Sequence, residues 1–496
     1  MKLCKDKTYI MMAVVILITA VFYGVICLSH NLWYDEAYTI ALIKHNIKDI
    51  VRITSNDVHT PLYYLFAKVF YNMFGLKETG VKLFSLICHI IYMGGMAYFV
   101  TKIWNKRIAL ISLIIGSLYV PTLIHSTEGR MYSFSMMCFT YAFFLGIMSL
   151  KKSKVYLWIL FTLFSVLAMY AHIFTMLAMF FTYIIFGIYI LIKLKKNKEY
   201  KSQLIWILVS AFVSAIAYVP WLSVVIKQTG RVSGSEDYLK FGLKSIFNCI
   251  VHYFTSEWNP SFMAIMIWAI IFIITFSYSI SVIIKGFKSK GNYKDNEEGT
   301  QKENIHPEIC LMMLLIVFLP TFFGIVFSMT VQNIYMGRYT YPMLGLMFVL
   351  GAISVQNMKK LNLYMLGILL LIVVSIPAYV KEYRRVNDKG MDIFRTYIKE
   401  NACDDDIYIV EGLHTSLISL ELEGKKVLTP GETKVYNPFP IEGYTTWEEL
   451  GEPSHIYYIS LEEPEYIWFF AEYPTEKVLD FNYMMYHFVV NKVDYR

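Results

Sequence analysis

Long apolar segments separated by short polar loops occupy about the first three quarters of the chain. A segment of about 20 apolar residues crosses a bilayer as a helix. The sequence therefore predicts eleven transmembrane helices, at residues 8–28, 79–101, 108–125, 131–150, 155–170, 173–192, 203–225, 260–284, 309–329, 339–356 and 361–380. The fifth and sixth are short and are separated only by the region around His172. The pattern is typical of an α-helical polytopic membrane protein.

Three segments between the predicted spans have a different character. The first loop, 29–78, contains an amphipathic stretch and then an apolar piece after Pro61 that is too short to cross comfortably, so we expect it to lie in the membrane interface. A second interfacial helix is predicted around 241–254. The loop 285–308 is rich in Lys, Asn, Glu and Gly and is predicted to be a disordered connector.

Beyond residue 380 the pattern changes to alternating helices and strands. It predicts helices at 391–400 and 413–421 and strands at 406–410, 426–428, 455–460 and 484–490. This alternation is typical of a small α/β layer domain. Two domains follow: a transmembrane domain, 1–380, and an extracytoplasmic α/β domain, 381–496.

Composition agrees with membrane insertion and charge gives the orientation. The chain is 56% hydrophobic and only 17% charged, with a mean hydropathy of +0.47, whereas soluble proteins carry roughly 25% charged residues. Basic residues alternate from loop to loop, which places the N-terminus in the cytoplasm and the C-terminal domain outside. The first span is expected to be an anchor rather than a cleaved signal.

The net charge is distributed unevenly. From residue 381 onward, 12 basic and 22 acidic residues give −10, and the remaining 33 basic and 16 acidic residues give +17. Topology and anionic lipid account for the basic excess, so no nucleic-acid partner is implied. The seven cysteines are scattered and predict neither a disulfide framework nor a zinc motif. The run Asp404-Asp405-Asp406 is interpreted as a solvated turn before a strand rather than a metal site.

Two adjacent carboxylates follow the first span directly. Asp35 and Glu36 are bracketed by Trp33, Tyr34 and Tyr38. Ionised groups at a membrane rim are costly unless they bind something, so they indicate chemistry on a membrane-embedded substrate. On a helical turn the two side chains would point about 100° apart and would not face the same substrate atom.

Three more polar clusters fall on the same predicted rim. They are the segment 125–132, with Glu128, Arg130 and Tyr132, the turn at His172, and the segment 335–339, with Arg338 and Tyr339. Each has a simpler interpretation in isolation. Glu128 and Arg130 could form a local ion pair, His172 could be a hydrogen-bonded structural residue, and Arg338 could be an interfacial anchor. Convergence of the clusters on one face favours a site.

The motifs occur in the order of a known family. They are Trp33-Tyr34-Asp35-Glu36-Ala37, His59-x-Pro61-Leu62-Tyr63, Glu128-Gly129-Arg130-Met131-Tyr132, Tyr170-x-His172 and Arg338-Tyr339. Over about residues 8–356 the chain resembles the bacterial relatives of the dolichyl-phosphate-mannose protein mannosyltransferases and the lipid A aminoarabinose transferases. These are multispan glycosyltransferases of the GT-C fold that use polyprenyl-phosphate sugars.

The resemblance implies roles for individual residues. Asp35 would be the general base, and Glu36 would support it, orient a loop or help to bind a cation. Arg130 and Arg338 would contact the donor phosphate, since guanidinium groups suit multidentate phosphate binding. The substrate-site support would come from Tyr34, His59, Glu128, Tyr132, His172 and Tyr339. No cofactor is required, although Glu36, Glu128 and His172 leave room for a divalent cation.

Departures from the family pattern leave the acceptor class open. Thr60 replaces the first of two usual prolines, Gly129 replaces a usual alanine and adds backbone freedom, and Ile173-Phe174 keeps only part of the third aromatic element. The expected partners are an undecaprenyl-phosphate-linked sugar, a glycan, lipid or protein acceptor, and membrane lipids. A sugar or lipid transporter or flippase is the main alternative, but the charges lie at one rim rather than near mid-membrane. A membrane-anchored sensor is another, and would leave the acidic motif without a role.

Overall fold

The computed structural model describes residues 6–494 except 75–76, 233–241, 253–261, 290–305, 332, 357–360, 412–414, 431–441, 445–449, 451–452, 462–472 and 485. The predicted connector at 285–308 therefore lies largely outside the described residues. The chain divides into two compact units. The first unit comprises Met1–Val25, Ser85–Thr127 and Met131–Tyr379, and the second comprises Ile26–Phe84, Glu128–Arg130 and Val380–Arg496.

Helices make up the first unit. They are α1 (Lys7–Cys27), α5 (Lys77–Ile103), α6 (Lys106–Leu118), α7 (Val120–Thr127), α8 (Tyr132–Lys152), α9 (Val155–Ala171), α10 (Ile173–Leu194), α11 (Tyr200–Val232), α12 (Leu243–His252), α13 (Phe262–Ser289), α14 (Pro307–Thr330), the 3₁₀ helix η2 (Gly337–Met343), α15 (Leu344–Gln356) and α16 (Leu361–Val386). The ends of α1, α5 and α16 belong to the second unit.

The described helices confirm a multi-pass membrane protein. Eight are long and apolar enough to cross a bilayer, or nine if α6 and α7, which meet at a bend of 74°, form one broken span. The predicted span 108–125 coincides with this bent pair, and the predicted span 155–170 coincides with α9, an apolar helix of 17 residues. The last predicted span coincides with α16.

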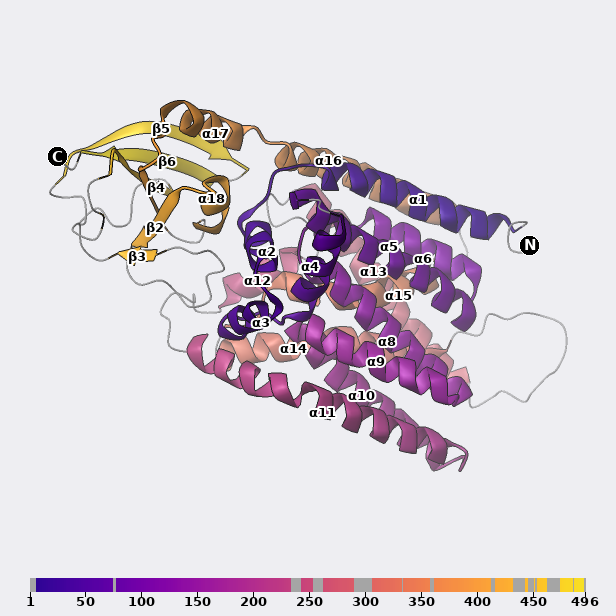
Figure 1. Ribbon diagram of the computed structural model, residues 1–496. Coiled ribbons are helices and arrows are strands. Elements are labelled where there is room, and N and C mark those ends of the chain that lie inside the picture. The colour runs from indigo at the N-terminus through magenta and orange to yellow at the C-terminus, as the bar shows by residue number, and fades with distance from the viewer. Residues whose placement is uncertain are drawn as a thin grey trace. The chain divides into compact units, whose positions relative to one another are not determined.

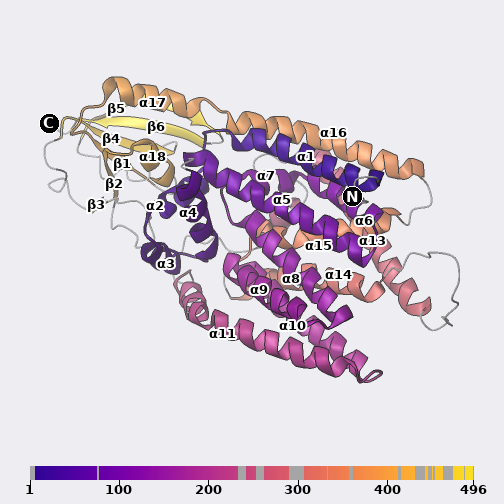
Figure 2. The same ribbon diagram turned by 45° about the vertical axis from the view of Figure 1, so that its right-hand side comes forward.

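Burial separates central helices of the first unit from peripheral ones. Of the most apolar window of α8, 83% is buried, against 22% for α11. Figures 1 and 2 both show α8, α9, α10 and α11 side by side. Phe143 on α8 and Phe161 on α9 both pack against Phe186 of α10, with ring centroids 5.8 and 6.0 Å from it. The exposed apolar side chains of α11 therefore suit contact with lipid.

The first and last long helices of the first unit run alongside each other (Figures 1 and 2). The Tyr379 hydroxyl of α16 donates a hydrogen bond of 2.8 Å to the Phe22 carbonyl oxygen of α1. The two rings also meet edge to face, with centroids 5.5 Å apart. Helices near opposite ends of the sequence are thus joined by a specific polar contact.

The second unit combines three short helices with an α/β region. The short helices are α2 (Tyr34–Lys44), α3 (Ile47–Asn56) and α4 (Leu62–Phe74). The α/β region contains α17 (Gly390–Asn401), α18 (Thr415–Glu421) and the strands β1 (Ile407–Val410), β2 (Lys426–Pro430), β3 (Glu442–Tyr444), β4 (Ile456–Leu461), β5 (Thr475–Tyr483) and β6 (Tyr486–Val493). Figure 1 shows α2, α3 and α4 in one group, with α18 beside α2. At 13 residues α4 is shorter than a membrane span.

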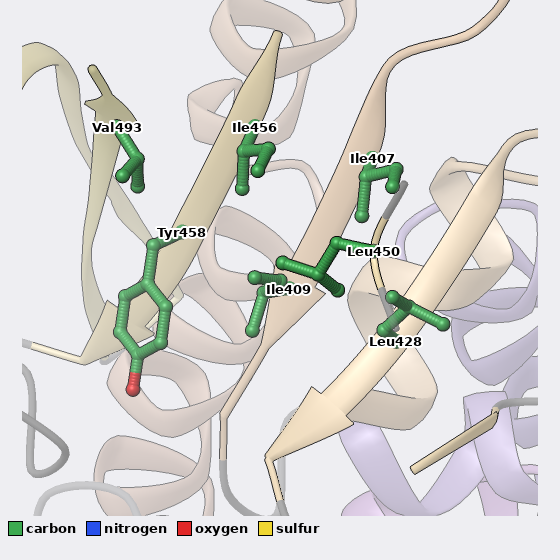
Figure 3. Close-up of a cluster of buried hydrophobic side chains, with 7 residues drawn as sticks. All are labelled: Ile407, Ile409, Leu428, Leu450, Ile456, Tyr458 and Val493. Carbon is green, nitrogen blue, oxygen red and sulfur yellow. The ribbon is translucent and has the colours of Figure 1, made fainter. Parts of the chain in front are cut away.

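The strands form one sheet in the order β3-β2-β1-β4-β6-β5. β1 to β4 pair in parallel, whereas β6 runs antiparallel to both β4 and β5. One face carries an apolar cluster, formed by Ile407, Ile409, Leu428, Leu450, Ile456, Tyr458 and Val493 (Figure 3). β1 and β4 are buried throughout almost their whole length, as expected of central parallel strands.

The helix α17 approaches the sheet closely at its first residue. A Cβ atom on Gly390 would lie 1.7 Å from the Asn482 carbonyl oxygen of β5. Only glycine leaves room for this contact. The aromatic rings of Phe394 on α17 and Phe481 on β5 stack with centroids 5.4 Å apart. These contacts hold α17 against the sheet.

The predicted solvated turn at 404–406 is partly wrong. Asp404 and Asp405 are exposed, but Asp406 is fully buried. The Asp406 Oδ2 atom accepts a hydrogen bond from the Cys403 backbone N–H at 2.7 Å, which folds the turn and draws the third carboxylate inward. A run of identical residues therefore contains two solvated positions and one structural one.

Candidate active site

The acidic-aromatic motif forms the start of α2 in the second unit. Trp33 is the N-cap residue, so Asp35 and Glu36 lie in the first helical turn of α2. Negative side chains at this position favour the helix because they face its exposed N–H groups. The Glu36 Oε2 atom accepts a hydrogen bond from the Trp33 N–H at 3.2 Å. Glu36 thus helps to cap the N-terminus of the helix in which it lies.

Glu36 also links α2 to the segment 128–130. Its Oε1 atom accepts a hydrogen bond from the Gly129 N–H at 2.8 Å. A Cβ atom on Gly129 would lie 3.0 Å from Cγ1 of Val81 and 3.6 Å from the Glu36 Oε1 atom. Gly129 does not adopt a positive φ, so the glycine supplies space for this contact rather than backbone freedom.

Asp35 and Arg130 form an ion pair. The Arg130 Nε atom lies 3.7 Å from the Asp35 Oδ2 atom, and the Nη1 atom donates a hydrogen bond of 3.2 Å to the Asp35 backbone oxygen. The Arg130 side chain is 1% exposed and that of Asp35 is 14% exposed. Arg130 therefore contacts both the backbone and the carboxylate of Asp35 from the buried side, and the Asp35 side chain is the less buried of the two.

The Arg130 guanidinium has further partners from α4 and the loop before it. Its Nη1 atom donates to the Tyr64 hydroxyl at 3.2 Å, and its Nη2 atom lies 3.0 Å from the His59 Nε2 atom. Because a guanidinium group only donates, His59 accepts through Nε2 and carries its proton on Nδ1. His59, predicted to support the site, thus contacts Arg130 directly.

Three residues of this network were not predicted: Tyr38, Asp57 and Tyr64. Burial raises the pKa of Asp57, and the nearby Tyr38 hydroxyl opposes that rise. The Asp57 Oδ2 atom lies 3.7 Å from the His59 Nε2 atom. Burial also raises the pKa of Tyr64, although the charge of Arg130 acts the other way. The sequence could have indicated Asp57 and Tyr64 by their position, because they lie on either side of the motif that begins at His59.

A second group of predicted residues meets in the first unit, around the start of α10. The His172 ring lies 5.9 Å from Tyr132 and 4.9 Å from Tyr339, measured between centroids. Phe174 packs at 5.2 Å from Tyr339. His172 caps α10, since its Nδ1 atom accepts a hydrogen bond from the Phe174 N–H at 3.1 Å. We call His172, Tyr132, Phe174 and Tyr339 the aromatic cluster.

The remaining predicted residues divide between the units. Arg338 lies in η2 of the first unit, partly buried and next to Tyr339. Tyr34, in the second unit, packs edge to face with Trp33 at 4.9 Å. Glu128 is buried, and its backbone oxygen accepts a hydrogen bond from the Arg130 N–H at 2.8 Å. A shared phosphate contact of Arg130 and Arg338 stays a prediction.

Two of the three proposed cation ligands, Glu36 and His172, are engaged in backbone contacts. Both carboxylate oxygens of Glu36 accept backbone N–H groups, and the His172 Nδ1 atom does the same. Such contacts use the lone pairs that a hard cation would need. A cation at Glu36, Glu128 or His172 stays a prediction, and no step below depends on it.

No model of a protein family matches the chain, and no curated protein matches it. Its fold is the one seen in the solved structures of ArnT. The chain is similar to ArnT, a lipid A aminoarabinose transferase, from Cupriavidus metallidurans in the apo state, with a TM-score of 0.63, 11% identity, and coverage of 96% of this chain and 97% of ArnT. The structure of the same ArnT bound to undecaprenyl phosphate gives a TM-score of 0.61 with 11% identity and 97% coverage of both chains. At this identity the likeness establishes the fold, so the predicted fold class is confirmed.

Proposed function

We propose that the protein is a membrane glycosyltransferase that moves a sugar from a polyprenyl-phosphate donor, undecaprenyl phosphate in a bacterium, to an extracytoplasmic acceptor. The observation that carries the proposal is the ion pair of Asp35 with buried Arg130 at the start of α2. The similarity to ArnT, which has been seen bound to undecaprenyl phosphate, supports the donor class.

Asp35 would act as the general base. Its carboxylate takes the proton of an acceptor hydroxyl while the acceptor oxygen attacks the anomeric carbon of the sugar. The bond from that carbon to the phosphate oxygen breaks, and polyprenyl phosphate leaves. A phosphomonoester is a good leaving group, so no acid opposite Asp35 is needed. One direct displacement inverts the configuration at the anomeric carbon.

Arg130 and Arg338 would stabilise the reaction in different ways. The contacts of Arg130 with the Asp35 backbone, Tyr64 and His59 support a role in positioning the base. Its predicted contact with the donor phosphate is retained as part of this proposal. Arg338 would bind the phosphate as negative charge develops on it.

The proposal requires the catalytic side of the protein to face away from the cytoplasm. The alternating basic loops support a cytoplasmic N-terminus and an external C-terminal domain. Single cysteines replacing Lys196 and Lys399 test this with an impermeant thiol reagent in intact cells, in a background lacking Cys4 and Cys403. We expect labelling at position 399 and not at 196, and the reverse would overturn the orientation.

Mass spectrometry of envelope glycans and lipids tests the function and requires no assumption about the sugar or the acceptor. A deletion strain is complemented with the unmodified gene, with Asp35→Asn or with Asp49→Asn. We expect a glycosylated species to disappear on deletion and to return with the unmodified gene and Asp49→Asn only. If no glycosylated species changes on deletion, or if Asp35→Asn restores it fully, the proposal is wrong.

A further inference from the structure

Three potential metal ligands meet at one end of the sheet in the second unit. Asp406 directly precedes β1 and His455 directly precedes β4, and the two strands pair in parallel with Ile407 opposite Ile456. The Ile407 N–H donates a hydrogen bond of 3.0 Å to the His455 backbone oxygen, which fixes the two residues beside each other. Cys403 joins them through the turn that Asp406 caps. The ligand atoms of Cys403, Asp406 and His455 all lie within 4.8 Å of one another.

Two atoms of this group, Asp406 Oδ1 and His455 Nδ1, face each other without a hydrogen bond. The Asp406 Oδ1 atom lies 3.0 Å from the His455 Nδ1 atom, and the Asp406 side chain is fully buried. Yet neither atom makes a hydrogen bond to any group in the described part of the chain. A buried carboxylate oxygen without a hydrogen bond costs free energy. Two lone-pair donors that face each other without a hydrogen bond suit a shared cation.

We propose that Cys403, Asp406 and His455 form a zinc site. Zinc is bound by thiolate at about 2.3 Å and by imidazole and carboxylate at about 2.0–2.2 Å in tetrahedral geometry. Two such nitrogen or oxygen ligands are then about 3.3 Å apart, close to the 3.0 Å between Asp406 Oδ1 and His455 Nδ1. A mixed set of sulfur, nitrogen and oxygen ligands favours zinc over calcium or magnesium. Water would complete the fourth position.

The surroundings hold the two ligand-bearing loops together. The Asp405 Oδ2 atom accepts hydrogen bonds from the Ser454 N–H at 3.0 Å and from its hydroxyl at 2.9 Å. This contact ties the turn at 403–406 to the residue before His455. The apolar cluster (Figure 3) includes Ile407 and Ile456, which directly follow Asp406 and His455 in the sequence. Because strand residues alternate between faces, the cluster lies on the face of β1 and β4 opposite to these two ligands.

On the ligand side, the next residues along the strands are aromatic. The rings of Tyr408 and Tyr457 stack with centroids 5.3 Å apart and planes within 13°, and the His455 ring lies 5.9 Å from Tyr457. The ligand-bearing His455 thus packs against an aromatic pair on the same face of the strands. A bound zinc ion would cross-link the starts of two central strands, so we assign it a structural role independent of the proposed transferase activity.

Cysteine reactivity provides a direct test on the purified full-length protein. Among the described cysteines only Cys403 is exposed, and Cys27, Cys88, Cys138, Cys249 and Cys310 are buried. In a Cys4→Ser background, alkylation of the folded protein therefore reports on Cys403. Zinc binding removes the thiolate from reaction, so one equivalent of zinc should slow alkylation by about tenfold or more.

Matched variants separate a zinc site from a simple ion pair of Asp406 and His455. Asp406→Asn and His455→Gln should abolish the protection by zinc, whereas Asp404→Asn, at a fully exposed side chain of the same turn, should retain it. If Asp406→Asn does not fold, Cys403→Ser replaces it. We then expect elemental analysis after chelation and reloading to find one zinc per unmodified chain and none in Cys403→Ser. Unchanged alkylation in the presence of zinc would show an ion pair only and overturn the proposal. Equal zinc content in Cys403→Ser would place the bound zinc at other residues and overturn it as well.

Discussion

The network around Arg130 and the aromatic cluster look alike in the sequence but are built differently. Both place polar residues among aromatic ones next to apolar helices. In the second unit, Arg130 is buried and makes hydrogen bonds to Asp35, Tyr64 and His59. In the first unit, His172 is held by ring packing and by its role as a helix cap. Burying a charged network costs free energy that only pairing and hydrogen bonds offset, whereas ring packing and capping stabilise a helix start directly.

The largest effect is expected at Asp35. Asp35→Asn keeps the shape of the side chain but cannot take a proton from the acceptor at neutral pH. Transfer should fall by about 10²- to 10⁴-fold, the usual contribution of a general base, while binding of undecaprenyl phosphate is retained. The rate of product formation and lipid binding by native mass spectrometry measure the two effects. Near-normal transfer would remove Asp35 from this role.

Arg130→Lys should give the next largest effect. Lysine keeps the charge but loses the planar group that contacts the Asp35 backbone and Tyr64 together. One lost charge-assisted contact costs about 1.5–3 kcal/mol, or roughly ten- to a hundredfold in transfer. Arg52→Lys is the control, because Arg52 is exposed and pairs with Asp49. Equal transfer by both variants would mean that the network does not position the base.

Arg338→Lys tests the phosphate contact proposed for the first unit. We expect about a tenfold loss, part of it in kcat, since the phosphate gains charge in the transition state. The exposed Arg384 provides the control Arg384→Lys. A change confined to thermal stability would make Arg338 an interfacial anchor.

Glu36→Gln should affect stability more than chemistry. An amide can accept from the Trp33 N–H or from the Gly129 N–H through its single oxygen, so one buried N–H loses its partner. The free energy of unfolding should fall by about 1–3 kcal/mol, and transfer should fall less than in Asp35→Asn. Thermal unfolding in detergent measures the first, with the exposed Glu400→Gln as control. A transfer defect as large as that of Asp35→Asn at full stability would make Glu36 a catalytic residue.

The smallest effect is expected at His172. His172→Ala removes the cap of α10 and should cost about 0.5–2 kcal/mol in stability. His172→Asn keeps a capping acceptor and should recover most of it. If Asn restores both stability and transfer, the ring contacts with Tyr132 and Tyr339 are dispensable. If Asn destabilises as much as Ala, the cap is not what His172 contributes.

The hydrophobic pattern predicted the helical part of the fold because most of the spans are long, apolar and bounded by polar loops. The α/β region was predicted less completely. Strand β5 was missed because it is followed by a tight hairpin without the Asn-Gly or Asp-Gly sequence that usually marks one. Met484 adopts φ +56° there instead, and Tyr483 pairs with Tyr486. A methionine is not a residue type that predicts a left-handed backbone conformation, so the sequence did not indicate a turn at this position.

The candidate site was predicted residue by residue but not as a network. Asp35 and Glu36 were distinguishable because their order in the first helical turn points them to different partners. The roles of Tyr38, Asp57 and Tyr64 depend on how α2, α3 and α4 pack, which no periodicity encodes. The same holds for Cys403, Asp406 and His455. Cys403 and His455 are more than 50 residues apart in the sequence, and only the pairing of β1 with β4 brings the three residues together.

A double-mutant cycle of Asp35 and Arg130 tests the central claim most directly. If Arg130 acts mainly by holding the base, its substitution matters little once the base is gone. Transfer is measured for the unmodified protein, Asp35→Asn, Arg130→Lys and the double variant at equal amounts of folded protein. The account predicts that the double variant is slower than Asp35→Asn by no more than a few fold. If the two losses multiply in full, Asp35 and Arg130 act independently and the positioning role is contradicted.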